Sequence, residues 1–179
     1  MAVRDTLKML MAALALAGIT GLYLSQVRRN GILGLVGYLV LSAGYLLILS
    51  TAFVAAFILP TVAAADPGYA NDVLAVTTGN SPTGDIGALA VVVKVQDFAY
   101  LGGGLLFGIA LFRAGVLARW ATVLLAVGGV VSAAISVMPD AFYRLLAFPN
   151  GIAMIGLGVS LWLVQRTAVE TSAPLVAAR

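Results

Sequence analysis

The sequence has no cysteine and no histidine, and only 9% of its 179 residues are charged. Without cysteine the chain can form no disulfide and use no thiolate, and without histidine it lacks the commonest general base and metal ligand. Soluble domains carry roughly 25% charged residues, so the shortage of charge excludes an ordinary soluble domain. We predict no metal site and no cofactor.

Apolar residues dominate the chain, of which 62% is hydrophobic. Several apolar runs reach about 20 residues, the length at which a helix crosses a hydrocarbon core of about 30 Å. The predicted fold class is an all-α membrane protein, a single bundle of about five transmembrane helices over residues 1–166, with a polar cytoplasmic tail at 167–179 that we expect to be disordered. The predicted spans are residues 7–27, 31–59, 86–112, 120–137 and 141–165, and residues 60–85 form one substantial extracytoplasmic loop.

The first span has an alternative interpretation as a signal peptide. Arg4 and Lys8 supply a basic start, and Ala15 and Ala17, before Gly18, are the small residues of a possible cleavage site. Cleavage there would place Arg28 and Arg29 on the outer, extracytoplasmic face of the membrane. Basic residues are usually enriched on the cytoplasmic face instead. We therefore expect the segment to be retained as a span.

The second span is longer than a bilayer requires. As a helix, residues 31–59 would extend about 44 Å, so the span must tilt or project beyond the membrane. One face of this helix is small and polar, which favours close packing against a neighbour. The residues on that face are Gly31, Gly34, Tyr38, Ser42, Tyr45, Leu49, Ala52 and Ala56.

Residues 60–85 contain turn-forming residues and no Lys or Arg. Asp66 followed by Pro67 is typical of a helix N-cap with proline at the first helical position, which predicts a short helix over Pro67–Thr77. Asp85 is expected to cap the third span. The loop could act as a lid or binding loop, but we expect a solvated connector.

The last two spans contain a packing stripe and an ambiguous proline. Gly128, Ser132 and Ser136 recur at spacings of four on the fourth span, which favours close helix packing. Pro149 predicts a kink within the fifth span. The alternative is a short interfacial helix over residues 140–148, lying flat on the membrane before a short inserted segment.

The basic residues predict a multi-pass protein of the cell membrane with its amino terminus outside and its carboxyl terminus in the cytoplasm. Arg4 and Lys8 are exceptions to this pattern. Because the basic residues are scattered, we expect anionic membrane lipid rather than nucleic acid as a partner. The inner side would hold Arg28, Arg29, Arg113, Arg119, Arg166 and Arg179, and the outer side Arg4, Lys8, Arg144, Asp5, Asp66, Asp72, Asp85 and Asp140.

Three segments carry a resemblance to a known group of proteins: GLYLSQVRRNGILGLVG at 21–37, AFVAAFILP at 52–60 and LLFGIALFRAGVLARW at 105–120. They resemble uncharacterised small multi-span membrane proteins common in actinobacteria. The likeness covers most of the chain but rests on helix ends and packing glycines. In such relatives an additional apolar helix often precedes the first segment, which would place the amino terminus inside. The resemblance implies no established activity and no catalytic residues.

Lys94 and Asp97 lie three residues apart inside the third predicted span, where charged side chains are costly. They are about 60° apart around a helix, so the two side chains can meet. Gly104 and Gly108 lie on the face of Asp97 and let another helix come close, so we expect Asp97 to point into the bundle. Other candidates for a polar centre are Tyr100, Tyr38, Ser42, Tyr45, Ser132, Ser136 and Arg144, while Gln96 faces a different neighbour.

Four interpretations of the charged pair remain open: an ion pair that fixes helix register, a polar cavity or transport pathway, catalysis with Asp97 as acid or base, and a carbonyl cofactor bound to Lys94. The first function hypothesis is a non-enzymatic membrane protein that binds lipid, a hydrophobic small molecule or a membrane partner. It could form a homo-oligomer through the faces of Gly104/Gly108 or Gly128/Ser132. The second hypothesis is a small membrane enzyme or transporter that uses a Lys94/Asp97 centre.

Overall fold

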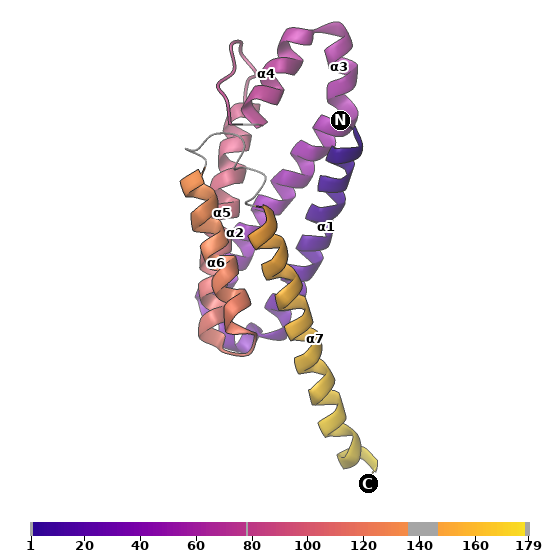
Figure 1. Ribbon diagram of the computed structural model, residues 1–179, viewed down its shortest axis with the longest axis vertical. Helices are drawn as coiled ribbons and strands as arrows, with labels where there is room; N and C mark the ends of the chain where they lie inside the picture. Colours follow the sequence, from indigo (N-terminus) through magenta and orange to yellow (C-terminus); the bar gives the residue numbers. More distant parts are fainter. Residues whose placement is uncertain (1, 78, 136–146, 178–179) are drawn as a thin grey trace.

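The computed structural model describes residues 2–77, 79–135 and 147–177, and within them the side chains of residues 3–77, 79–128 and 151–167. All regular structure in these residues is helical, which confirms the all-α class. Figure 1 shows an elongated bundle with the amino terminus in its upper part and the carboxyl terminus below it. The elements are α1 (Ala2–Ser25), α2 (Val27–Phe53), a π-helix (Val54–Ile58), α3 (Leu59–Ala65), α4 (Pro67–Thr77), α5 (Leu89–Ala114), α6 (Arg119–Ile135) and α7 (Ala147–Ala177).

Five helices surround the core in the order α1, α2, α5, α6 and α7, and α7 closes the arrangement by packing against α1. Each of the five contributes fully buried apolar side chains, among them Ile19, Leu41, Phe107, Ala121 and Leu157. The turn between α5 and α6 is tied to α7 because the backbone N–H of Ala118 donates to Ser160 Oγ at 2.9 Å. The bundle is therefore one continuous packed unit.

Three helices are long and apolar enough to cross a membrane: Val3–Ser25, Val27–Ala65 and Leu89–Ala114. They correspond to the first three predicted spans, whose membrane-span character is confirmed. Within the described residues, the apolar parts of α6 and α7 are shorter, at Arg119–Gly128 and Gly151–Thr167. The fourth and fifth spans stay predictions.

The second span continues past the point where we expected it to end. Gly31 (φ +57°, ψ −162°) interrupts α2 near its start, and from Ile32 the chain is helical through Ala65, a length of about 51 Å. Pro60 does not end the helix, because a π-helix, Val54–Ile58, lies just before it. The wider π turn includes Ala56, whose carbonyl the proline ring would otherwise meet. The helix consequently projects above the other spans, as the upper part of Figure 1 shows.

The segment predicted as a loop is folded. The backbone N–H of Tyr69 donates to Asp66 Oδ1 at 3.0 Å, which confirms the predicted N-cap, and α4 has the predicted bounds. Most residues of this segment are exposed, but α4 also packs against α3 and α5. A small second core holds this hairpin together, formed by Leu59, Ala70, Val73 and Ile86.

The predicted cap of the third span was also wrong. Asp85 Oδ1 accepts a hydrogen bond from the backbone N–H of Gly87 at 2.7 Å, so the carboxylate closes a local turn. Gly87 has a φ of +62°, a left-handed conformation that glycine adopts without strain. The chain turns there, and α5 begins after Ala88.

Glycines on two faces of α5 let its neighbours approach at backbone distance. A Cβ atom at Gly103 would meet the backbone of Leu41 on α2, and one at Gly108 would lie 2.7 Å from the backbone nitrogen of Ala126 on α6. The close approach predicted for the Gly104/Gly108 face is confirmed. That face is covered by α6 of the same chain, so a second copy would have to pack elsewhere.

The carboxyl-terminal helix α7 includes Pro149, two residues after its first described residue, Ala147. Residues 141–146, which would decide between a kinked span and an interfacial helix, lie outside the described residues. The expectation of a disordered tail was wrong, because α7 continues through Ala177. Extending an existing helix requires no new nucleation.

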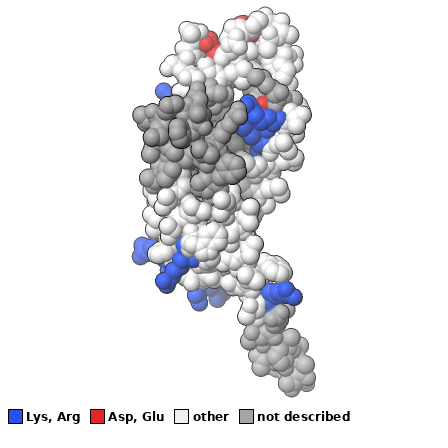
Figure 2. Space-filling model, viewed as in Figure 1, with Lys and Arg blue, Asp and Glu red and all other residues white. Residues whose placement is uncertain are grey.

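The charged residues are distributed unevenly between the two ends of the bundle. Figure 2 shows only basic side chains at the lower end of the visible face, and acidic side chains together with further basic ones in its upper part. The basic turns are those of residues 26–30 and 113–119, and the acidic end is the α3–α4 hairpin. This uneven distribution is what a protein oriented across a membrane is expected to show.

Two adjacent glycines test the contact between α2 and α5. Gly103→Ala should lower the free energy of unfolding by about 1–3 kcal/mol, because the methyl group forces the two backbones apart. Gly102→Ala is the matched control, since a Cβ atom there meets nothing within 4 Å. Unfolding of both variants can be measured in detergent by circular dichroism. Equal stability of the two would contradict the packing described.

Candidate functional site

The expected ion pair between Lys94 and Asp97 does not form. Both residues are exposed, and among the described residues no ion pair joins them. Asp97 lies only about 12 Å from the start of α5, a helix of 26 residues, or about 39 Å, that is longer than the hydrocarbon core. At this depth headgroups and water can solvate each charge separately, so pairing is not required.

Asp97 instead lines a cavity of about 110 Å³ between α1, α2, α4 and α5, which we call the polar pocket. Helices distant in sequence meet here because α2 packs against both α1 and α5, and α4 of the α3–α4 hairpin folds back against α5 (Figure 1). The polar pocket is lined by Arg4, Asp5, Lys8, Ile48, Thr51, Ala52, Ala55, Leu74, Val76, Thr77, Gly79, Val93, Gln96 and Asp97.

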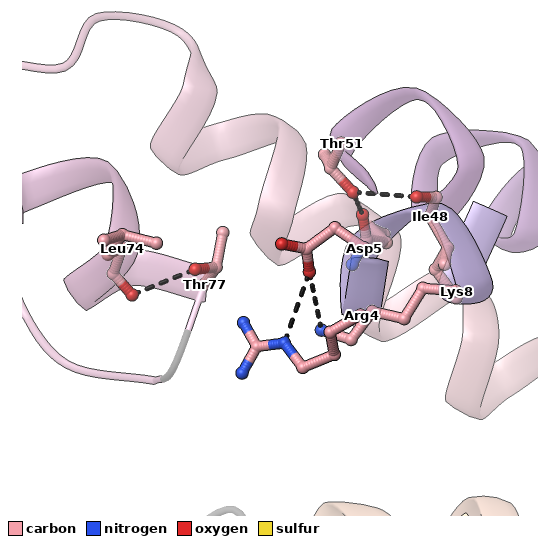
Figure 3. Close-up of polar contacts among 8 residues, drawn as sticks. Arg4, Asp5, Lys8, Ile48, Thr51, Leu74 and Thr77 are labelled. Atoms are coloured by element: carbon pink, nitrogen blue, oxygen red, sulfur yellow. Dashed lines mark hydrogen bonds and ion pairs between the residues drawn. The ribbon is translucent and has the colours of Figure 1, made fainter. Parts of the chain in front are cut away.

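One wall of the polar pocket is a buried carboxylate between two cations. Asp5 is only 4% exposed. Its Oδ1 lies 3.4 Å from Arg4 Nε and 3.8 Å from Lys8 Nζ (Figure 3). The two cations remain more than half exposed, so they balance the buried charge while still reaching solvent. This stabilisation is local to the first turns of α1.

The burial of Asp5 has a signal in the sequence that our prediction missed. Asp5 shares a helical stripe with Ala12 and Ile19 at spacings of seven, and all three are buried. A carboxylate on the apolar stripe of a helix is expected to face the bundle. Arg4 and Lys8, which disagreed with the predicted orientation, are the partners of this carboxylate.

The opposite wall is formed by α2 and α5. Thr51 Oγ1 lies 2.8 Å from Gln96 Oε1 and donates across the two helices. Gln96 thus faces a different neighbour from the glycines below Asp97, as expected. Next to it, Asp97 is a lining carboxylate that no Lys or Arg of the described residues contacts within ion-pair distance.

The α3–α4 hairpin covers the polar pocket, and Asp72 on α4 is hydrogen-bonded to the loop that follows α4. Leu74, Val76 and Thr77 line the cavity. Asp72 Oδ1 accepts hydrogen bonds of 2.8 Å from both the backbone N–H and the hydroxyl of Thr83, and its Oδ2 accepts one of 2.9 Å from the Gly84 N–H. The bonds from Thr83, with a smaller effect of the Gly84 N–H, hold the pKa of Asp72 below its ordinary value.

The predicted tyrosines form a separate aromatic layer in the bundle. Tyr38 stacks on Tyr23 with ring centroids 4.6 Å apart, and its hydroxyl lies 3.1 Å from Thr20 Oγ1. Tyr45 and Tyr100 meet edge to face at 5.4 Å. Neither pair lines the polar pocket, so these residues pack helices rather than surround Asp97.

The other predicted site residues are not assembled around Asp97. Ser42 Oγ is buried and has no hydrogen-bond partner among the described residues. Gly128 is buried on α6. The side chain of Ser132 and the residues Ser136 and Arg144 lie outside what the structure describes. Among the described residues no group of three or more acidic side chains could hold a metal ion.

Comparisons with other proteins identify no family and no function for this chain. No protein-family model, no characterised protein and no solved structure matches this chain. Any function must therefore be argued from the geometry of the described residues.

The Asp72 contacts predict a pH-dependent hairpin. A carboxyl group with a lowered pKa in the folded state stabilises that state above its unfolded pKa, about 3.9, and the contribution is lost as pH falls through the folded pKa. Hydrogen exchange of the Thr83 and Gly84 amides should therefore be slow near neutral pH and lose protection only in strong acid. Asp72→Asn should remove this pH dependence, and unchanged protection in that variant would contradict the assignment.

Proposed function

We propose that this chain is a multi-pass protein of the cell membrane that binds the positively charged group of a lipid or hydrophobic small molecule in the polar pocket. Helices of membrane-span character and the uneven distribution of charge support the location. The same distribution supports a cytoplasmic carboxyl terminus and an extracytoplasmic α3–α4 hairpin. The fourth and fifth spans then follow α6 and α7.

The position of Asp97 is the observation that carries this function. The charge of Asp5 is already balanced by Arg4 and Lys8, whereas Asp97 lines the same cavity and is paired with no cation of the described residues. A cavity of about 110 Å³ accommodates a group of a few heavy atoms, such as an ammonium. The carboxylate and the Gln96 amide oxygen supply acceptors for its N–H groups.

The remaining lining suits the apolar part of such a molecule. Ile48, Ala55 and Leu74 supply hydrocarbon surface beside the polar groups. Arg4 and Lys8 stay exposed, so they could meet the negative group of a zwitterionic molecule. A polar head with an apolar tail matches this distribution better than a fully polar solute does.

The layer below the polar pocket favours binding over passage. Ile19, Leu41, Phe107 and Leu111 are buried to 2% exposure or less and pack together across the bundle. Within the described residues this apolar layer separates the polar pocket from the basic end. A ligand that enters among α1, α4 and α5 is thus expected to leave by the same route.

A single-cysteine assay tests the proposal, since the natural chain has no cysteine. Ala52→Cys places a thiol in the polar pocket, and Ala121→Cys, a fully buried position outside it, is the matched control. A small methanethiosulfonate should modify the thiol of the Ala52→Cys variant and leave the control unmodified. Decylammonium should then protect the pocket thiol in a concentration-dependent way.

Substitution of Asp97 should weaken that protection. Asp97→Asn removes a charge-assisted hydrogen bond of about 1.5–3 kcal/mol, so the half-protecting concentration should rise about tenfold or more. Lys94→Gln is the control, because Lys94 is exposed and does not line the cavity. Protection that is equal in the parent and Asp97→Asn would exclude the proposal.

A small membrane enzyme or transporter that uses a Lys94/Asp97 centre is the second candidate. The cavity at Asp97 favours it, because a charged side chain beside an open cavity suits proton or solute transfer. The separation of Lys94 from Asp97 argues for the binding protein. If Lys94→Gln impairs decylammonium protection as strongly as Asp97→Asn, the two residues act together and this candidate is preferred.

The proposed orientation has its own test. A reporter fused after Arg179 should be active in its cytoplasmic form, because the basic turns are expected on that side. Complementary reporters, one active only in the cytoplasm and one only outside it, give the reading. An extracytoplasmic result would reverse the orientation while leaving the polar pocket unaffected.

A further inference from the structure

A second cavity lies at the opposite end of the bundle, beside the turn between α1 and α2. It has a volume of about 490 Å³, and we call it the basic cleft. Arg28 and Arg29 line it and are exposed, so their guanidinium groups can reach an occupant. The basic cleft is lined by Leu24, Ser25, Gln26, Val27, Arg28, Arg29 and Val116.

Gln26 gives the basic cleft a polar group without a partner. The residue is only 3% exposed, and neither its side-chain nitrogen nor its side-chain oxygen has a hydrogen-bond partner among the described residues. The amide of Asn30, one turn further on, is buried and unpartnered in the same way. Buried amides are nearly always hydrogen-bonded, so an unpartnered one lining a cleft points to a ligand.

Among the described side chains, the positive charge at this end has no acidic counterpart. The lining of the basic cleft contains two arginines and no acidic residue. Arg113 and Arg119 flank the neighbouring turn, and the described acidic side chains belong to the other half of the bundle (Figure 2). An anion is therefore the complementary occupant.

We infer that the basic cleft binds a phosphate group, the chemistry shared by a phospholipid headgroup and free phosphate. Guanidinium groups match phosphate oxygens with paired hydrogen bonds, and the Gln26 side-chain N–H group donates a further one. The cleft is larger than a phosphate ion, and Leu24, Val27 and Val116 give it apolar surface beside the arginines. These features favour the phosphate of an anionic lipid over the free ion.

Native mass spectrometry of the purified full chain can test the site. The protein in detergent is titrated with dioleoylphosphatidylglycerol and, separately, with dioleoylglycerol, which has the same acyl chains and no phosphate. Only the phosphate-bearing lipid should bind with saturation. Arg28→Gln/Arg29→Gln should weaken the first binding step about tenfold or more.

The control removes the same charge from the neighbouring turn. Arg113→Gln/Arg119→Gln lies outside the basic cleft and should change the first binding step less than about twofold. Gln26→Leu keeps roughly the same side-chain volume but removes the amide, and it should weaken the first binding step several-fold. Equal losses in the two arginine pairs, or no loss with Gln26→Leu, would reduce the cleft to diffuse surface charge and overturn the inference.

Inorganic phosphate distinguishes the two sources. If it fails to displace the lipid, the headgroup is the occupant, as we expect. Displacement at the concentration that saturates the site would support the phosphate site and assign it to the free ion. Thermal unfolding of every variant in the same detergent verifies that the compared proteins are folded.

Discussion

The close contact between α2 and α5 is the constraint on which the rest of the structure depends. Lipid offers no hydrophobic drive for helices to associate, so their attraction comes from packing at short range. Gly37 and Gly44 on α2 and Gly103 on α5 provide it, since a Cβ atom at Gly37 would lie 2.5 Å from the backbone nitrogen of Phe107. Only at this separation can Thr51 reach Gln96 across the two helices. The same contact sets the width of the polar pocket.

The two cavities follow from the ends of this helix pair. Above the contact, α2 continues as a π-helix and α3, so the hairpin with α4 can fold back against α5. Below it, the turn at residues 26–30 brings two arginines beside a buried amide. An apolar layer separates the ends, which keeps their opposite electrostatic characters apart. In our proposals each end binds a different charged group, without a shared path.

The local patterns were the ones that the sequence predicted well. The cap at Asp66 and the bounds of α4 depend on neighbouring residues only, and the glycines at 104 and 108 report a contact on one helix face. The helix through Pro60 was missed because the preceding π turn has no sequence signature that we could read. Pairing of Lys94 with Asp97 was inferred from spacing alone, whereas depth along α5 decides whether two charges need each other. The polar pocket required tertiary structure, since its lining comes from four helices.

The burial of Asp5 explains why the polar pocket is asymmetric. A carboxylate that is 4% exposed would be costly without partners, and both of its cations come from its own helix, so α1 carries a nearly self-contained charged wall. Because that wall needs nothing from α5, Asp97 has no Lys or Arg partner among the described residues, and in our proposal it receives the incoming cation. Had Lys8 reached across to Asp97 instead, Asp5 would retain a single partner and the cavity would be closed by an ion pair. The local pairing on α1 is therefore what keeps the carboxylate on α5 available.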